Sequence, residues 1–133
     1  MLNPKKSLGQ NFLIDKNITK KIVLLGKIKK SEVLEIGPGT GNLTNEILKY
    51  KPRKTVLVEK DSKLCQILKE KFKFKKDIEI LNNDILNFNI ENKINKNCII
   101  FGNLPYNVST QILVKFIKFK VWPPKYKKLI FMF

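Results

Sequence analysis

The sequence contains no histidine, only one arginine and only two cysteines, and these shortages exclude several functions. Without histidine there can be no histidine general base or nucleophile–histidine pair, and a zinc site is disfavoured. Cys65 and Cys98 match no metal or redox spacing, so we expect both to be reduced and packed in the fold. No apolar run is long enough to span a membrane, and the N-terminus lacks a signal-peptide core. We therefore expect a cytoplasmic protein with neither a membrane nor a metal as partner.

Acidic residues are also scarce. Lysine and arginine number 27 against 11 acidic residues, which gives a net charge of +16 and predicts a polyanionic partner, RNA or DNA before a membrane. All the cations except Arg53 are lysines, which meet phosphate as point charges. Lysine, asparagine and isoleucine are all abundant, so compositional drift is an alternative source of the charge. The 133 residues, 43% of them apolar, suffice for one domain with its own core.

The most informative stretch is a glycine-rich loop after a short apolar run. The run 33–36 (VLEI) is typical of a buried parallel strand, and Gly37, Gly39 and Gly41 follow it at every second position. A helical pattern comes next. A strand, a glycine turn and a helix N-terminus together form a cradle for a nucleotide, because glycine permits positive φ and leaves no Cβ between the backbone and the ligand.

The glycine spacing separates two kinds of nucleotide loop. The dinucleotide fingerprint G-x-G-x-x-G has its third glycine one residue later than this loop has, and Pro38 offers no N–H to a pyrophosphate. A nicotinamide-dependent oxidoreductase is therefore disfavoured. The loop is similar to that of S-adenosylmethionine-dependent methyltransferases. Another nucleotide turn or a tight strand–helix connection remains an alternative.

The rest of the chain alternates strand and helix patterns, which predicts an α/β fold with a mostly parallel sheet. Ser109, Asp15 and Asp61 each precede a helical pattern as a candidate N-cap. The basic run 69–76 is interpreted as a helix end in which Phe72 and Phe74 pack and the lysines face water. Residues 87–97 are polar and predict a loop or a poor helix. The further strands are expected at 55–58, 78–81, 98–101 and 129–133.

Two acids follow predicted strands and are candidate ligand-binding residues. Glu59 ends the second strand, where an acid in a doubly wound sheet accepts hydrogen bonds from ribose hydroxyls. Asp84 follows the third strand and could accept from an adenine amino group, although Asp and Asn also favour plain turns. Residues 1–13 (MLNPKKSLGQNFL) are either a tethered arm or a lid whose polar groups touch the ligand.

The segment Asn103–Tyr106 (NLPY) predicts the chemistry. It follows the fourth strand, and Pro105 fixes a turn where ligand crevices open. The side-chain carbonyl of Asn103 and the backbone carbonyl of Leu104 can converge there, beside the flat ring of Tyr106. These groups suit a flat base that carries an amino group. Acceptors that hold both amino protons would favour a more tetrahedral, nucleophilic nitrogen, and no histidine is needed.

The motifs together resemble the N-terminal part of the ribosomal RNA adenine dimethyltransferases of the KsgA type. The resemblance covers nearly the whole chain in family order. Antibiotic-resistance rRNA methyltransferases share the general pattern, but the opening motif and N-L-P-Y favour the housekeeping group. The matching segments are 5–13 (KKSLGQNFL), 34–44 (LEIGPGTGNLT), 58–61 (VEKD), 82–84 (NND) and 102–113 (GNLPYNVSTQIL).

The resemblance implies a fold, a cofactor and a reaction. It implies a Rossmann-like class I methyltransferase fold over residues 1–133, C-terminally truncated: closing strands and a C-terminal helical domain of the family would be missing. The implied cofactor is S-adenosyl-L-methionine, and the implied reaction is dimethylation of two adjacent adenosines in a stem-loop near the 3′ end of small-subunit rRNA. The implied partner is the immature small ribosomal subunit, with the protein a monomer. A non-catalytic RNA-binding assembly factor is the alternative.

The resemblance also assigns roles to individual residues. The residues that would contact the cofactor are Asn11, Leu13, Gly37, Glu59, Asp84 and Asn103. Those that would hold the target adenine at the catalytic centre are Asn103, Leu104, Pro105 and Tyr106. A base in a stem-loop must leave its stack to reach such a pocket.

Overall fold

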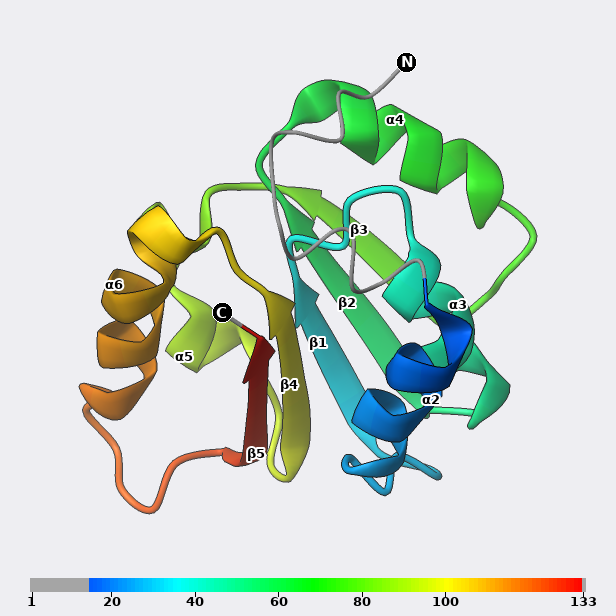
Figure 1. The fold of residues 1–133 in the computed structure, drawn as a ribbon. Coiled ribbons are helices and arrows are strands. Elements are labelled where there is room, and N and C mark those ends of the chain that lie inside the picture. The colour runs from blue at the N-terminus through cyan, green and yellow to red at the C-terminus, as the bar shows by residue number, and fades with distance from the viewer. Residues whose placement is uncertain (1–14, 133) are drawn as a thin grey trace.

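The structure is a computed structural model that describes residues 15–132, and its centre is a five-stranded sheet (Figure 1). The strand order is β3-β2-β1-β4-β5, and every neighbouring pair is parallel. This is an α/β fold with a parallel sheet, as the alternating patterns predict. The strands are β1 (Glu32–Ile36), β2 (Lys54–Glu59), β3 (Ile78–Asn82), β4 (Cys98–Asn103) and β5 (Tyr126–Met132).

Helical segments join successive strands. Asp15 and Asp61 accept hydrogen bonds from first-turn N–H groups of α2 and α4, which confirms the two aspartate caps. Residues 87–97 contain the last residue of the 3₁₀ turn η2 and the four-residue helix α5, in line with the expected loop or poor helix. The helical segments are α2 (Lys16–Leu24), α3 (Asn42–Lys49), α4 (Ser62–Lys71), the 3₁₀ turn η2 (Ile85–Asn87), α5 (Ile90–Lys93) and α6 (Tyr106–Ile117).

The helices cover both faces of the sheet because side chains alternate along each strand. Leu34 and Ile100 lie on one face and pack in a core with residues of η2, α5 and α6. Val33 and Ile99 lie on the other face and pack with α2 and α3, while Leu57 packs with α4. Figure 1 shows α2 and α3 on one side of the sheet and α5 and α6 on the other. The sheet is therefore doubly wound, with neighbouring β1 and β4 at the point where the strand order reverses.

Two local predictions are wrong. Ser109 does not cap α6: the helix begins at Tyr106 with Pro105 as its N-cap, and the Ser109 hydroxyl donates to the Tyr106 carbonyl inside the helix. Phe72 is buried as expected, but the Phe74 side chain is 89% exposed. The reason is that α4 ends at Lys71, so Phe74 lies beyond the helix and does not share its buried face.

A parallel sheet has two chemically distinct edges. The C-terminal ends of the strands lie together along one side of the sheet, here called the carboxyl edge, where the connections leave the strands. The N-terminal ends lie together along the opposite side, here called the amino edge, where the connections enter the strands. Within residues 15–132, no helix is long and apolar enough to cross a membrane. Both cysteines in this part of the chain are buried and free, as expected.

Candidate functional site

A pocket of about 460 Å³ opens at the carboxyl edge, where β1, β2 and β4 end beside η2. This is the place at which doubly wound sheets bind ligands. The pocket collects most of the residues predicted from the sequence. The predicted residues in its lining are Gly37, Glu59, Asp84, Asn103, Leu104 and Pro105.

The glycine loop that borders the pocket requires its glycines. Gly37, Gly39 and Gly41 have φ values of 65°, 61° and 92°, a region that side chains other than glycine rarely adopt. A Cβ on Gly37 would lie 3.3 Å from the Asn103 carbonyl oxygen, so the ends of β1 and β4 approach closely. A Cβ on Gly41 would lie 3.0 Å from the ring of Phe72, the residue that follows α4. The loop is thus fixed by its own backbone and by its packing.

Glu59 joins the glycine loop to the end of β2. Its two carboxylate oxygens accept hydrogen bonds from the Gly39 N–H at 3.1 Å and the Asp61 N–H at 2.9 Å. Burial raises the pKa of Glu59 above its ordinary value, and the two backbone donors act in the opposite direction. Each carboxylate oxygen has a second lone pair, so Glu59 can hold the loop and still accept a bond from a ligand.

Asp84 has a structural task as well as a place in the pocket. Its carboxylate caps η2 by accepting from the Leu86 N–H at 3.0 Å, and it forms an ion pair with Lys60 at 3.6 Å. The turn interpretation is therefore confirmed as far as the local structure goes. The second interpretation, a hydrogen bond to a ligand, is compatible with this geometry, because Lys60 is mostly exposed and leaves acceptor capacity on Asp84.

Asn103 differs from the two acids because its side chain makes no hydrogen bond within residues 15–132, although the residue is only 7% exposed. The next residue, Leu104, donates its N–H to Met132 at 3.1 Å, and its carbonyl oxygen accepts no bond from the same part of the chain. Buried polar groups are normally hydrogen-bonded, and this amide and this carbonyl both border the pocket. These two acceptors can therefore bind a ligand without giving up an existing contact.

Three predicted residues are not among those in the lining. The Tyr106 side chain is 83% exposed and does not line the pocket, although the residue begins α6 immediately after Pro105. Asn11 and Leu13 lie outside the described residues. The roles of all three remain predictions.

Glu35, which the sequence reasoning did not single out, lies on the face of β1 that α3 covers. The residue is fully buried; its Oε1 accepts from the Thr44 hydroxyl at 2.6 Å, and its Oε2 has no partner in the described chain. Burial raises the pKa of Glu35 from 4.5 to about 7, with a smaller contribution from the Glu59 charge and an opposing one from Thr44. An acid inside an otherwise apolar strand was the available signal.

Lys115 is a second residue that the sequence reasoning missed. It is half-buried, and its ammonium group donates to the Ile85 and Phe88 carbonyls, so it ties α6 to the segment that carries Asp84. Burial lowers the pKa of Lys115. A lysine next to the apolar stripe of Ile112 and Phe116 was the sequence signal. Within residues 15–132, no cluster of three or more acids and cysteines could hold a metal.

The family model and the curated relatives that match the chain carry the names of enzymes that methylate ribosomal RNA. The family model described as ribosomal RNA adenine dimethylase matches residues 1–133. The chain is 55% identical to ribosomal RNA small subunit methyltransferase A of Pelagibacter ubique over 113 residues, which are 85% of the chain and 42% of that protein. It is 40% identical to the protein of the same name from Cereibacter sphaeroides, over 99% of the chain and 48% of that protein. The chain thus spans about half the length of the curated relatives it matches.

Solved structures give the same result. The 23S rRNA methyltransferase ErmE superposes with a TM-score of 0.74 at 27% identity, covering 87% of this chain and 45% of that one. A dimethyladenosine transferase from Plasmodium falciparum superposes with a TM-score of 0.72 at 30% identity, covering 88% and 42%. The doubly wound sheet is therefore a Rossmann-like methyltransferase fold. With its family match over the whole length and its relatives above 30% identity, the chain belongs to the ribosomal RNA adenine dimethylase family.

Proposed function

We propose that residues 1–133 are the cofactor-binding part of an S-adenosylmethionine-dependent rRNA adenine dimethyltransferase. The observation that carries the proposal is the common pocket: the Asn103 amide and the Leu104 carbonyl, which have no hydrogen-bond partner within residues 15–132, share one lining with Glu59 and with Gly37 of the glycine loop. A nucleoside cofactor fits these residues, because the site offers carboxylates for hydroxyl and amino donors and, at Gly37, a positive-φ residue without a side chain that leaves the backbone open to a ligand.

Four described residues would hold the cofactor in this proposal. Gly37 admits it close to the backbone, and Glu59 accepts from its ribose hydroxyls while still holding Gly39. Asp84 accepts from the adenine amino group, and Asn103 borders the space between the cofactor and the target base. Ile36, Val58 and Ile85 belong to the apolar part of the lining. When bound, the cofactor supplies a methyl group on a positively charged sulfur.

The target adenine would be positioned by the segment Asn103–Tyr106. The Asn103 side-chain oxygen and the Leu104 carbonyl accept the two protons of the amino group, which draws the nitrogen lone pair out of the ring and aims it at the methyl group. Pro105 lies between these acceptors and α6, so the helix fixes the turn. The exposed Tyr106 ring would stack on the base after it leaves its helix.

Membership of the family supports a proposal for the substrate and the cellular setting. Relatives at 40–55% identity are named ribosomal RNA small subunit methyltransferase A. We infer that the full-length protein dimethylates two adjacent adenosines near the 3′ end of small-subunit rRNA, on the immature subunit, as a cytoplasmic monomer. The Asn103 side chain has no hydrogen-bond partner within residues 15–132, which speaks against a non-catalytic assembly factor, since such a protein has no use for a buried amide that awaits a ligand.

The first test is a calorimetric titration of the chain with S-adenosylmethionine, with NAD as the control ligand. We expect binding of the first compound only. The second test is transfer of labelled methyl groups to immature small subunits by the enzyme with its full family length. Asn103→Ala should leave cofactor affinity largely unchanged and reduce turnover roughly a hundredfold or more, as loss of one transition-state partner does.

Each test has an outcome that contradicts the proposal. Binding of NAD in preference to S-adenosylmethionine would assign the pocket to another cofactor. Unchanged turnover in Asn103→Ala would remove the residue from the catalytic centre. The matched control is Asn107→Ala, which also shortens a pocket-lining asparagine but lies outside the proposed pair of acceptors. It should retain most of the turnover.

A further inference from the structure

Positive charge is segregated to one edge of the sheet. The segments that enter strands contain only one acid, Asp77, among residues 15–132, whereas the segments that leave strands contain Asp61 and Asp84 and a single cation, Lys60. The pocket edge is thus nearly neutral and the opposite edge is strongly basic. The cations of the entering segments are Lys27, Lys29, Lys30, Lys51, Arg53, Lys73, Lys75, Lys76, Lys96, Lys118, Lys120 and Lys125.

At the centre of the amino edge these cations surround a hollow of about 300 Å³, here called the amino-edge hollow. Its lining includes Lys30, Arg53, Lys96 and Lys127 around the single acid Glu32. These residues come from the segments before β1, β2 and β4 and from β5 itself, so the parallel topology brings them together. Within the described chain, the side chains of Lys30, Lys96 and Lys127 have no polar partner.

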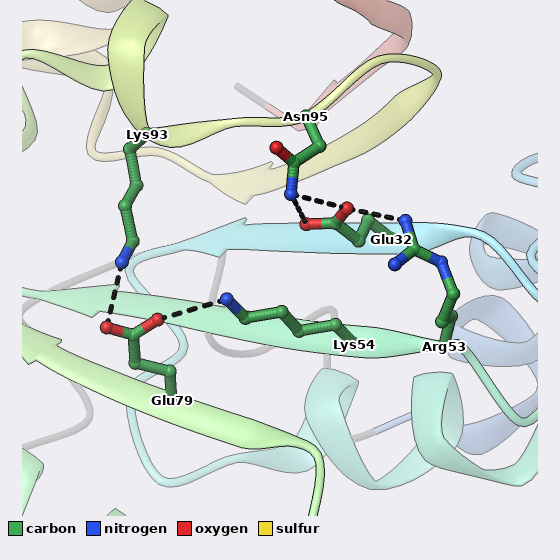
Figure 2. A network of polar contacts seen from close by, with 6 residues as sticks. All are labelled: Glu32, Arg53, Lys54, Glu79, Lys93 and Asn95. Carbon is green, nitrogen blue, oxygen red and sulfur yellow. Dashed lines mark hydrogen bonds and ion pairs between the residues drawn. The ribbon is translucent and has the colours of Figure 1, made fainter.

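The one acid in the hollow is already neutralised. Glu32 is 5% exposed, and its carboxylate accepts from Arg53 at 2.6 Å and from the Asn95 amide at 2.8 and 3.0 Å (Figure 2). The neighbouring Glu79 is likewise held between Lys54 and Lys93. The Arg53 side chain remains 60% exposed and presents its outer donors to solvent. The lysines therefore act on whatever enters the hollow without competition from a local carboxylate.

The geometry points to a binding site for phosphate groups, and we propose that its ligand is the phosphate backbone of RNA. This inference rests on the proposed rRNA substrate and adds a second contact to it. Strands of five or six residues span about 17–20 Å, so the amino-edge hollow and the cofactor pocket lie at opposite ends of the sheet. The RNA segment bound in the hollow is therefore distinct from the adenosine in the pocket. Lysines contact phosphates without reading bases, so this contact positions the RNA and carries no sequence specificity.

The test measures how RNA affinity depends on salt. The association constant falls as salt rises, and each phosphate that the protein neutralises makes the slope of log K against log salt concentration steeper by about 0.7–0.9. The triple variant K30Q/K96Q/K127Q is compared with the wild-type chain on a fluorescent RNA duplex without cofactor. The matched control is K16Q/K63Q/K69Q, which removes the same charge from exposed lysines outside the hollow. We expect the slope to become shallower by about 2–3 in the hollow variant and by less than about 1 in the control.

Several outcomes would overturn the inference. Equal slopes in the two variants would show that only the net charge matters. Binding of inorganic pyrophosphate in the hollow with unchanged RNA slopes would assign it to a small phosphorylated ligand, and lysine-dependent binding to anionic vesicles but not to RNA would assign it to a lipid surface. Calorimetry with S-adenosylmethionine on the same proteins separates the two proposals. If the wild-type chain binds S-adenosylmethionine and the two variants have equal salt slopes, only the inference about the amino-edge hollow is refuted. If the wild-type chain does not bind S-adenosylmethionine, the proposed function is refuted.

Discussion

Glu35 predicts an unusual dependence of stability on pH. Its pKa is raised from 4.5 to about 7 in the folded protein, so the folded state binds this proton more tightly than the unfolded chain does. The stabilising contribution is therefore complete below pH 4.5, declines as the pH rises from 4.5 to about 7, and is absent above that value. Each unit of pKa separation is worth about 1.4 kcal/mol, so the free energy of unfolding should fall by about 3 kcal/mol across this window.

The missing histidines make this window easy to interpret, because no imidazole titrates within it. The assay is urea-induced unfolding at pH values from 4 to 8.5, followed by circular dichroism. Glu35→Gln keeps the shape and an acceptor for the Thr44 hydroxyl but cannot titrate. The variant should lose most of the decline, and its stability relative to wild type should rise with pH. Burial also raises the pKa of Glu59, so a decline in the same direction should remain in the variant.

A second variant tests the cause of the shift. Thr44 donates to Glu35 and lowers its pKa, so Thr44→Val should move the window to higher pH. The reasoning would be refuted by a wild-type free energy of unfolding that is constant between pH 4.5 and 7.5. It would equally be refuted by a Glu35→Gln variant that shows the same decline as wild type.

Three further predictions concern the surroundings of the pocket. Asp84→Ala should weaken binding of S-adenosylmethionine by about 1–3 kcal/mol in a calorimetric titration. Asp84→Asn should keep the η2 cap and separate loss of binding from loss of structure, whereas equal affinities in all three proteins would remove Asp84 from the site. Gly41→Ala should lower the free energy of unfolding by about 1–3 kcal/mol, because φ is 92° and the new Cβ meets Phe72. The control Asn42→Ala, at an exposed position, should change it little, and equal free energies in the two variants would contradict the left-handed turn. Lys115→Met should reduce stability by about 1–3 kcal/mol in thermal unfolding because two carbonyls lose a charged donor, and a result no different from exposed Lys118→Met would show that this tie contributes nothing.

Local sequence rules predicted the framework of the fold well. The apolar runs at 33–36, 55–58 and 98–101 are buried strands, and the aspartates that precede two helical patterns are the N-caps of α2 and α4. These predictions succeeded because they depend on neighbours along the chain. The grouping of Glu59, Asp84 and Asn103 could also be predicted, since residues that follow parallel strands meet at one edge of the sheet.

Other features depend on distant contacts, and the sequence did not reveal them. Ser109 has the chemistry of an N-cap, but Pro105 precedes it by a full turn and its carbonyl accepts from the Val108 and Ser109 N–H groups, so α6 starts earlier. Lys115 finds its acceptors about thirty positions back in the chain. The burial of Glu35 against Thr44 follows only from the packing of α3 on β1.

The two backbone hydrogen bonds that Glu59 accepts have a consequence for the comparison of related genes that have lost activity. A copy of this protein that no longer catalysed any reaction would still need the carboxylate, because Gly39 and Asp61 both donate to it and the loop depends on these bonds. Selection for folding alone would preserve Glu59 long after activity was lost. The Asn103 side chain makes no structural hydrogen bond within residues 15–132, so this position would be substituted earlier than Glu59. Under the proposed function, an intact asparagine at this position would indicate a working enzyme in a comparison of such genes, whereas an intact glutamate would not.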